Sequence, residues 1–260
     1  MTIATRGNVK VSFDGEVKYV TLDRMDPVSV KGALDNQKYD VIIDKIAYSS
    51  NDVKALLENV SCDRYIQMST CSVYPKEHAN ISEDEFVTSE YPLEWMDRIS
   101  DYEKTKRNAE RAVLEFMDPL ACTFVRYPVV LGENDYTKRL NFYIEHIKND
   151  QPMYVDDLDE AMAFIHEKEA GEFIAYLAEH PFSGPVNGCS NGVIKISDII
   201  NYAEKRIGKK AILDEKGEVA PFNGFTDTFS LRTERAKAAG YIFSELDSWI
   251  YKLIDHEIEK

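Results

Sequence analysis

Short apolar strands alternate with amphipathic helices along the first part of the chain, and this alternation constrains the fold more than any other feature. The clearest strand, at 39–46, is a nearly continuous apolar run, as expected in a parallel sheet covered on both faces. Strands and helices that alternate in this way predict an α/β fold. Strands are expected at 2–5, 17–22, 39–46, 64–68 and 121–126, and helices at 27–34, 52–60, 102–116 and 138–148.

The pattern becomes less regular after Pro152. Because open α/β sheets bind ligands outside the carboxyl ends of their strands, this second part is expected to cap those strand ends. Strands are expected there at 161–165 and 185–187, and helices at 170–179, 196–207 and 249–258.

The composition is that of an acidic protein of 260 residues, of which 44% are hydrophobic, enough for a sizeable core. A net charge of −15 argues against a surface that binds nucleic acid, because phosphate backbones require clustered Lys and Arg.

The sequence shows no membrane-length apolar run, no signal-peptide pattern and only scattered cysteines, so a cytoplasmic protein is expected. The histidines show no metal-ligand spacing, so no metal site is indicated.

Tyr102 and Lys106 stand four residues apart at the start of an expected helix, so their side chains share one helix face. A cation close to a phenol favours the phenolate and lowers the pKa of the phenol. A tyrosine so placed can exchange a proton with a substrate hydroxyl or carbonyl near neutral pH. Upstream, the hydroxyl-rich segment 69–74 follows a strand-like run. A hydroxyl, a tyrosine and a lysine in this order are the working parts of a hydride-transfer site.

Three segments in this order resemble the extended short-chain dehydrogenase/reductase family, and in particular its NAD-dependent epimerase/dehydratase group. Tyr102 and Lys106 match the family's YxxxK pattern, and 69–75 (Ser-Thr-Cys-Ser-Val-Tyr-Pro) matches its SSxxVYG strand end. The segment 125–132 (Val-Arg-Tyr-Pro-Val-Val-Leu-Gly) matches the LRPxxVYG segment beside the nicotinamide. The resemblance covers nearly the whole chain.

The resemblance implies a Rossmann-like, doubly wound parallel sheet with a smaller C-terminal α/β substrate part. The dinucleotide-binding domain would span 1–150, truncated at its N-terminus, and the substrate-binding part 151–260, with chain crossovers between the two. Tyr102 would be the general acid and base, and Lys106 would lower its pKa and hold the nicotinamide ribose. Thr70 would hydrogen-bond the reacting oxygen.

The resemblance also implies a dinucleotide cofactor, NADP or NAD. Arg6 follows the first strand, where the adenosine 2′ position would lie, and an arginine there favours a 2′-phosphate and hence NADP. The other implied cofactor contacts are Asp23 and Arg24 at the adenine, Ala47 and Tyr48 under the pyrophosphate and ribose, Lys106 at the ribose, and Pro128 and Val129 beside the nicotinamide.

Each assignment has a structural alternative. Tyr102 and Lys106 could be an ordinary tyrosine and a solvated lysine on a helix surface. Thr70 could be a β-branched strand end, and Ser72, the reserve candidate for its role, a turn former. Arg6 could belong to an ordinary polar turn.

The family's opening strand, its GxxGxxG loop and the helix that follows have no counterpart in this sequence. That loop brings backbone N–H groups and a helix N-terminus to the pyrophosphate. The expectation is that about 20–30 residues of a βα unit are missing before the strand at 2–5. This chain is therefore expected to bind a dinucleotide weakly or not at all.

Two further departures bear on the reaction. Dehydratases of the family carry Asp-Glu directly after the catalytic threonine, whereas this chain has Cys71 and Ser72, which disfavours a dehydratase. Family epimerases hold a nucleotide diphosphate with an Asn where this chain has Val129. The expected function is an NAD(P)-dependent oxidoreductase or epimerase that acts by hydride transfer on a hydroxyl or carbonyl of a sugar-like small molecule. The alternatives are a non-catalytic or cofactor-deficient relative that acts as a binding protein and, least favoured by the charge, an RNA-binding protein.

A homodimer is a further expectation, because relatives pack the tyrosine-bearing helix and the helix before it into a four-helix bundle. The apolar stripes of the two helices could form this bundle or face the sheet as core. They consist of Val53, Leu56, Leu57 and Val60 on one side and of Ala109, Ala112, Val113 and Phe116 on the other.

Overall fold

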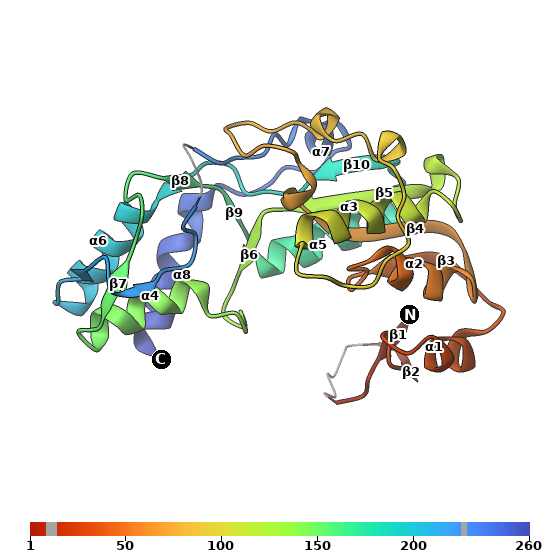
Figure 1. The fold of residues 1–260 in the computed structure, drawn as a ribbon, viewed down its shortest axis with the longest axis horizontal. Coiled ribbons are helices and arrows are strands. Elements are labelled where there is room, and N and C mark those ends of the chain that lie inside the picture. Colours follow the sequence, from red (N-terminus) through yellow and green to blue (C-terminus); the bar gives the residue numbers. More distant parts are fainter. Residues whose placement is uncertain (9–14, 225–227) are drawn as a thin grey trace. The chain divides into compact units, whose positions relative to one another are not determined.

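The computed structural model of the chain describes residues 1–8, 15–224 and 228–260 (Figure 1). These residues form two compact units, and the chain passes between the units several times. The first unit comprises Met1–Val73, Phe86–Val125 and Leu177–Pro185, and the second comprises Tyr74–Glu85, Arg126–Tyr176 and Val186–Lys260.

The first unit is built on a four-stranded sheet with the strand order β10–β5–β4–β3. β3 and β4 run parallel, with Val41 opposite Arg64, which confirms the predicted α/β fold with a parallel central sheet. β4 is the longest of these strands and carries Thr70 at its carboxyl end. The strands are β3 (Gln37–Asp44), β4 (Val60–Thr70), β5 (Cys122–Tyr127) and β10 (Gly184–Asn187).

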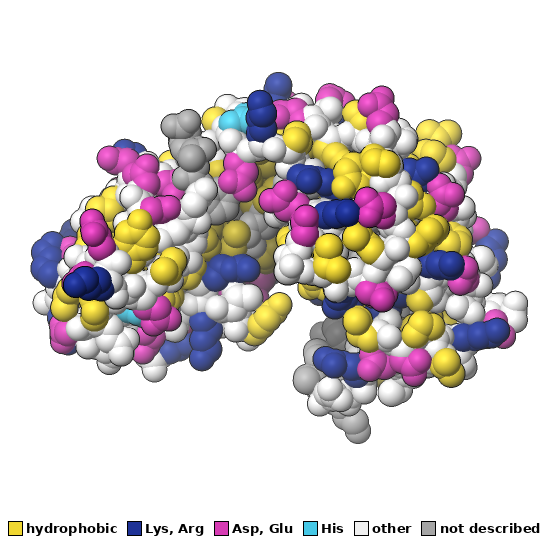
Figure 2. Space-filling view, viewed as in Figure 1, with side chains coloured by type: hydrophobic (Ala, Val, Ile, Leu, Met, Phe, Trp, Pro, Cys, Tyr) yellow, Lys and Arg dark blue, Asp and Glu magenta, His cyan; other side chains and the backbone are white. Residues whose placement is uncertain are grey.

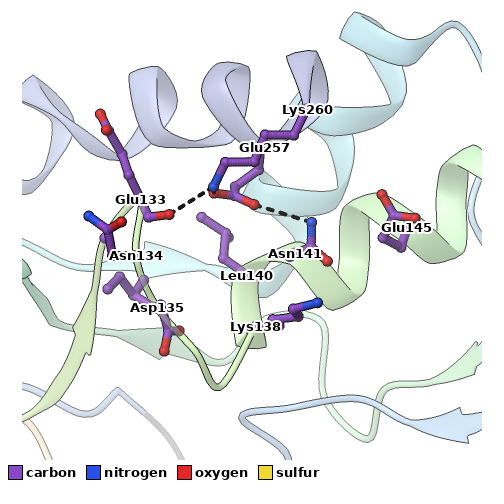
Figure 3. A pocket seen from close by; sticks show the side chains of 11 residues that line it. Glu133, Asn134, Asp135, Lys138, Leu140, Asn141, Glu145, Glu257 and Lys260 are labelled. Atoms are coloured by element: carbon purple, nitrogen blue, oxygen red, sulfur yellow. Dashed lines mark hydrogen bonds and ion pairs between the residues drawn. The ribbon is translucent and has the colours of Figure 1, made fainter. Parts of the chain in front are cut away.

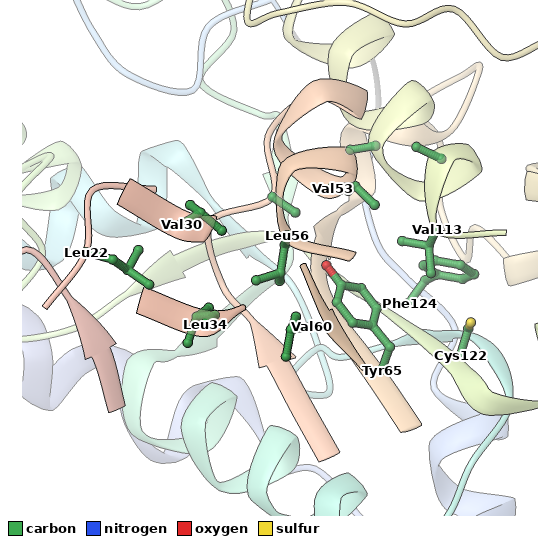
Figure 4. Packing of buried hydrophobic residues seen from close by; sticks show 13 residues of the cluster. Leu22, Val30, Leu34, Val53, Leu56, Val60, Tyr65, Val113, Cys122 and Phe124 are labelled. Atoms are coloured by element: carbon green, nitrogen blue, oxygen red, sulfur yellow. The ribbon is translucent and has the colours of Figure 1, made fainter. Parts of the chain in front are cut away.

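Helices cover both faces of this sheet. The buried side chains of α2 and α3 form one apolar cluster with Tyr65 of β4 (Figure 4). Arg64, the neighbour of Tyr65, instead donates hydrogen bonds to two carbonyl oxygens in the last turn of α5. Because adjacent strand residues point to opposite faces, α2 and α3 lie on one face and the end of α5 on the other, as in a doubly wound fold. The helices are α2 (Ser50–Leu57), α3 (Tyr102–Val113) and α5 (Glu167–Glu179).

A second, two-stranded sheet belongs to the same unit, and a break separates it from the central sheet. In the described part of the chain, the parallel strand β1 pairs with β2 alone, and β3 pairs with β4 alone. The two sheets nevertheless share a core, because Leu34 of α1 belongs to the same apolar cluster as Leu56 of α2. On β3, Ile43 is 39% exposed, whereas the side chains of a central parallel strand are normally buried on both faces. The elements are β1 (Thr2–Thr5), β2 (Lys18–Thr21) and α1 (Pro27–Leu34).

The apolar stripes that could have formed a dimer interface are core. Their side chains are buried, or half-buried against the same cluster, so they face the sheet and not a partner. Of the two alternatives, a dimer interface or core, the structure therefore shows that these stripes are core. The homodimer stays a prediction, and these stripes do not supply its interface. The buried members are Val53, Leu56, Val60, Ala109, Ala112 and Val113, and the half-buried ones are Leu57 and Phe116.

The second unit combines short strands with a group of packed helices. β6 and β9 pair in parallel, β8 and β11 pair antiparallel, and β7 lies between β12 and β13. α4, α6 and α8 pack against one another. The elements are β6 (Val129–Leu131), β7 (Pro152–Tyr154), β8 (Ala161–Met162), β9 (Phe164–His166), β11 (Ile194–Lys195), β12 (Ile212–Leu213), β13 (Glu218–Val219), α4 (Arg139–Lys148), α6 (Ile196–Ile207), α7 (Glu234–Ala238) and α8 (Ile250–Glu259).

The predicted division at residue 150 differs from the two units. The segment 126–150 belongs to the second unit, because α4 packs on the later helices α6 and α8. The strand predicted at 161–165 is in fact two strands, since β8 pairs with β11 and β9 pairs with β6. No helix among the described residues is long and apolar enough to cross a membrane.

Candidate active site

α3 presents the predicted catalytic tyrosine and lysine at different depths. Asp101 caps the helix by accepting a hydrogen bond from the backbone N–H of Lys104 at 2.9 Å, so Tyr102 falls in the first turn. Tyr102 is 43% exposed, whereas Lys106, one turn later, is 3% exposed. The alternative of a solvated lysine is therefore wrong.

The Lys106 ammonium joins the ends of two neighbouring strands. It donates hydrogen bonds to the carbonyl oxygen of Ala47, which follows β3, at 2.9 Å and to that of Met68, in β4, at 3.0 Å. Burial lowers the pKa of Lys106 to about 8, and the carboxylate of Glu110 is the strongest influence in the opposite direction. The lysine is thus poised between its two protonation states near physiological pH.

The ring of Tyr48 lies next to this pair. The Lys106 Nζ is 5.2 Å from the centroid of the Tyr48 ring, and the Tyr102 ring centroid is 6.3 Å from it. The guanidinium carbon of Arg98 lies 4.3 Å from the same centroid, an arrangement typical of a cation–π contact. The structure therefore brings together four of the residues proposed for the site, Ala47, Tyr48, Tyr102 and Lys106, and it adds Arg98. No sequence signal pointed to Arg98, which lies in the segment between β4 and α3.

Thr70 ends β4 and is half-buried. Its hydroxyl donates a hydrogen bond to the Ser72 hydroxyl at 3.3 Å and accepts one from the Ser72 backbone N–H at 3.2 Å. From α3, the Arg107 Nε donates a hydrogen bond to the carbonyl oxygen of Val73 at 2.8 Å. The helix that carries Tyr102 is thereby fastened to the turn that follows Thr70, so both residues belong to the carboxyl end of β4.

The residues predicted at the adenine lie after β2. Asp23 is exposed, and its carboxylate accepts a hydrogen bond from the Met25 backbone N–H at 2.9 Å. Arg24 is buried and pairs with the carboxylate of Asp44 at 2.6 Å, and it also donates a hydrogen bond to the carbonyl oxygen of Asp52. Arg24 thus links the loop after β2 to the end of β3 and to α2, a structural role that the sequence did not reveal.

Arg6 is exposed directly after β1. Pro128 and Val129 lie in the second unit, where Val129 begins β6 opposite Phe164 of β9. The contacts of these three residues with a cofactor stay predictions.

The helix N-termini of the first unit do not fit the diphosphate of a dinucleotide. Such a group binds where first-turn N–H groups are open and no negative charge competes. At α1, the Asp26 carboxylate accepts the hydrogen bond of the Val28 N–H at 2.9 Å. At α2, Ser49 and Asp52 form a capping box, and at α3 Asp101 occupies the equivalent place. Among the described residues, each of these three ends therefore already carries a carboxylate.

A pocket of about 520 Å³ lies in the second unit, where the loop after β6 meets α4 and the end of α8 (Figure 3). Beside it, the Glu257 carboxylate accepts hydrogen bonds from Lys260 at 2.6 Å and from Asn141 at 3.2 Å. None of the predicted catalytic residues is among its described lining residues, and no group of three or more possible metal ligands occurs in the described part of the chain. The lining residues are Leu131, Gly132, Glu133, Asn134, Asp135, Lys138, Leu140, Asn141, Glu145, Glu257 and Lys260.

Several solved structures with the same fold are named as epimerases or dehydratases of sugar nucleotides. The UDP-glucuronic acid 4-epimerase of Bacillus cereus, in complex with UDP-glucuronic acid and NAD, is 19% identical with a TM-score of 0.67, over 94% of this chain and 81% of that chain. The UDP-glucose 4-epimerase of Thermus thermophilus, in complex with NAD, is 12% identical with a TM-score of 0.65, over 98% and 90%. The dTDP-glucose 4,6-dehydratase of Bacillus anthracis str. Ames, in complex with NAD, is 14% identical with a TM-score of 0.65, over 94% and 80%. At these identities the likeness shows the fold alone.

No curated protein sequence matches the chain. The sequence profile of the NAD dependent epimerase/dehydratase family matches residues 36–192, more than half of the chain. This segment contains Thr70, Tyr102 and Lys106 together with the strand ends that hold them. The chain belongs to the NAD-dependent epimerase/dehydratase family.

Proposed function

We propose that the protein is an oxidoreductase or epimerase that acts on a hydroxyl or carbonyl group of a sugar-like small molecule. The observation that carries the proposal is the arrangement at the carboxyl end of β4. There a half-exposed Tyr102 stands one turn above a buried Lys106, and α3 is fastened to the turn that follows Thr70. The relatives of the same fold are crystallised with sugar nucleotides or NAD, which supports a substrate of this class.

The proton half of the reaction follows from this chain's own residues. Tyr102 takes the proton from a substrate hydroxyl or returns it to a carbonyl, and its exposure gives a substrate access to the phenol. The charge of Lys106 favours the phenolate that forms when Tyr102 gives up its proton. The Thr70 hydroxyl is free to turn from Ser72, to which its hydrogen bond is long at 3.3 Å, toward the reacting oxygen.

The proposed hydride carrier is NAD, which the description of the family names, or NADP. Ala47, Tyr48 and Lys106 lie together where they would meet the ribose, and Arg6 would favour a 2′-phosphate. The carboxylates at the three helix N-termini do not favour the diphosphate, so these residues alone hold a dinucleotide weakly. The dissociation constants of NADH and NADPH, measured by isothermal titration calorimetry, test this, and micromolar binding would contradict it.

The enzymatic proposal is tested with the Tyr102→Phe variant. The protein is incubated with excess NAD or NADP and a panel of UDP-sugars and free sugars, and product is followed by NADH absorbance and by NMR. Turnover by the unaltered protein should be lost in Tyr102→Phe, while the affinity for NADH, however weak, should be unchanged. Equal turnover in both proteins would reject Tyr102 as the acid and base.

The weak diphosphate site favours a second candidate, a cofactor-deficient relative that acts as a binding protein. Under this candidate, a sugar nucleotide would bind without turnover, and Tyr102→Phe would change nothing but affinity. A nucleic-acid ligand is not favoured, because acidic and basic side chains are interspersed over the face shown in Figure 2 and the net charge is −15.

A further inference from the structure

Glu110 is a fully buried carboxylate on α3, four residues after Lys106 and on the same helix face. It accepts a hydrogen bond from the Ser69 hydroxyl at 2.5 Å and another from the Thr88 hydroxyl at 2.8 Å. An oxygen–oxygen distance of 2.5 Å is typical of a hydroxyl bonded to an ionised carboxylate. A negative charge therefore lies within the first unit, held by hydroxyl groups.

The Ser69 hydrogen bond ties this carboxylate to the end of β4. Ser69 directly precedes Thr70, and neighbouring strand residues point to opposite faces. Fixing the Ser69 side chain on the α3 face therefore fixes the direction in which the Thr70 side chain leaves the strand. Thr88, in the 3-10 turn Thr88–Glu90, holds the second carboxylate oxygen and completes the anchor.

The charged groups around Lys106 come from four segments. Glu110 on α3, Asp44 at the end of β3 and Asp52 on α2 all favour the charged ammonium, and Arg98 opposes it. Asp44 is paired with Arg24 at 2.6 Å and Asp52 with Arg98 at 3.1 Å, so a guanidinium already offsets the charge of each. Glu110 exerts the largest of the three favourable effects.

We propose that Glu110 is a positioning residue of the candidate active site, which keeps the Lys106 ammonium charged and, through Ser69, fixes the orientation of Thr70. The inference deepens the proposed function and rests on its assignment of Lys106 and Thr70. Its test needs no substrate and no cofactor, so it can fail or succeed separately from the proposed activity.

The test is an NMR titration of the whole chain labelled with ¹³C,¹⁵N-lysine, in which the Lys106 signal is assigned by its loss in Lys106→Met. The unaltered protein should titrate at about pH 8. Glu110→Gln keeps the size and one of the two acceptor oxygens but removes the charge, and we expect the midpoint to fall by about one pH unit. Glu103→Gln is the matched control, because Glu103 lies on α3 with its side chain 56% exposed beside Arg107 and should leave the midpoint unchanged.

An unchanged midpoint in Glu110→Gln, or an equal fall in both variants, would overturn the proposed electrostatic role. If Glu110→Gln does not fold, Glu110→Asp draws the charge back by one methylene, and the midpoint should still fall, though by less.

The positioning role is measured separately, by hydrogen exchange. Ser69→Ala should speed exchange of the Thr70 amide severalfold while leaving the Lys106 midpoint near its original value. Unchanged exchange would overturn this part.

Discussion

Two buried cations of the first unit, Arg24 and Lys106, lie in surroundings of opposite kind. Burial disfavours the charge of Arg24, but the Asp44 carboxylate at 2.6 Å, together with Tyr65 and Asp52, outweighs this effect, so the pKa of Arg24 is raised. Lys106 is hydrogen-bonded to two neutral carbonyl oxygens, and burial lowers its pKa to about 8. Arg24 is therefore fixed in its charged form, whereas Lys106 can change charge near physiological pH.

The difference separates a structural ion from a candidate functional one. A side chain that holds its charge at all accessible pH values can fasten loops, as Arg24 does for the ends of β2 and β3. A buried group with a shifted pKa, one helix turn from an exposed tyrosine, is a common mark of an active site. The comparison favours Lys106 over Arg24 as the residue that a ligand contacts.

The largest expected effect is the loss of stability in the Arg24→Met variant. The substitution leaves the Asp44 carboxylate buried without its cation, which typically lowers the free energy of unfolding by about 3–5 kcal/mol. Urea denaturation measures the change. Arg24→Met combined with Asp44→Asn should recover part of the loss, because the uncompensated charge is gone. A loss below about 1 kcal/mol for the single variant would show that the pair behaves like an exposed one and would break the comparison.

Local sequence signals predicted the helices other than α7 and pointed to the residues of the candidate site, but not to the partners of the buried ions. The helix predicted at 27–34 matches α1, and the spacing of Tyr102 and Lys106 predicted that they share one face of α3. The helix predicted at 52–60 starts earlier in the structure, because Ser49 and Asp52 form a capping box. That box depends on how the chain leaves β3, which periodicity does not report.

The pair of Arg24 with Asp44 joins residues from separate elements, and only the packed structure brings them together. The contact of Arg98 with Tyr48 is of the same kind. By contrast, Lys106 and Glu110 stand four residues apart on α3, and this spacing is a local signal of a common helix face that the sequence contains. What could not be read from it is the hydrogen bond of Glu110 to Ser69 on a distant strand.

An intermediate effect is expected in the pH dependence of stability, which sharpens the comparison for Lys106. Below pH 8 this lysine is protonated in both the folded and the unfolded chain, so it adds no pH dependence to the free energy of unfolding. Between about pH 8 and its ordinary pKa of 10.5, the unfolded chain keeps a proton that the folded chain has released. The free energy of unfolding should therefore rise with pH in this window, by up to about 3 kcal/mol.

The measurement is the difference between the unaltered protein and Lys106→Met, each unfolded in urea from pH 7 to pH 10.5. Taking the difference removes the contributions of other groups, such as Tyr65, whose pKa burial raises. Lys104→Met serves as control, because Lys104 is a half-buried neighbour on the same helix, and its hydrogen bond to Glu94 raises its pKa instead of lowering it. A difference that does not change with pH would mean that Lys106 titrates as an ordinary lysine.

The smallest effect on stability is expected for Tyr102→Phe, and it separates function from folding at this site. Tyr102 is 43% exposed, so the loss of its hydroxyl should change the free energy of unfolding by no more than about 0.5 kcal/mol. The midpoint of Lys106 in the NMR titration should also stay near pH 8, since the influences on its charge come from burial, Glu110, Asp44, Asp52 and Arg98. A large loss of stability would instead make Tyr102 a structural residue, and lost turnover in this variant would then say nothing about proton transfer. Unchanged stability with lost turnover would assign the proton to Tyr102, because the buried half of the site would be intact.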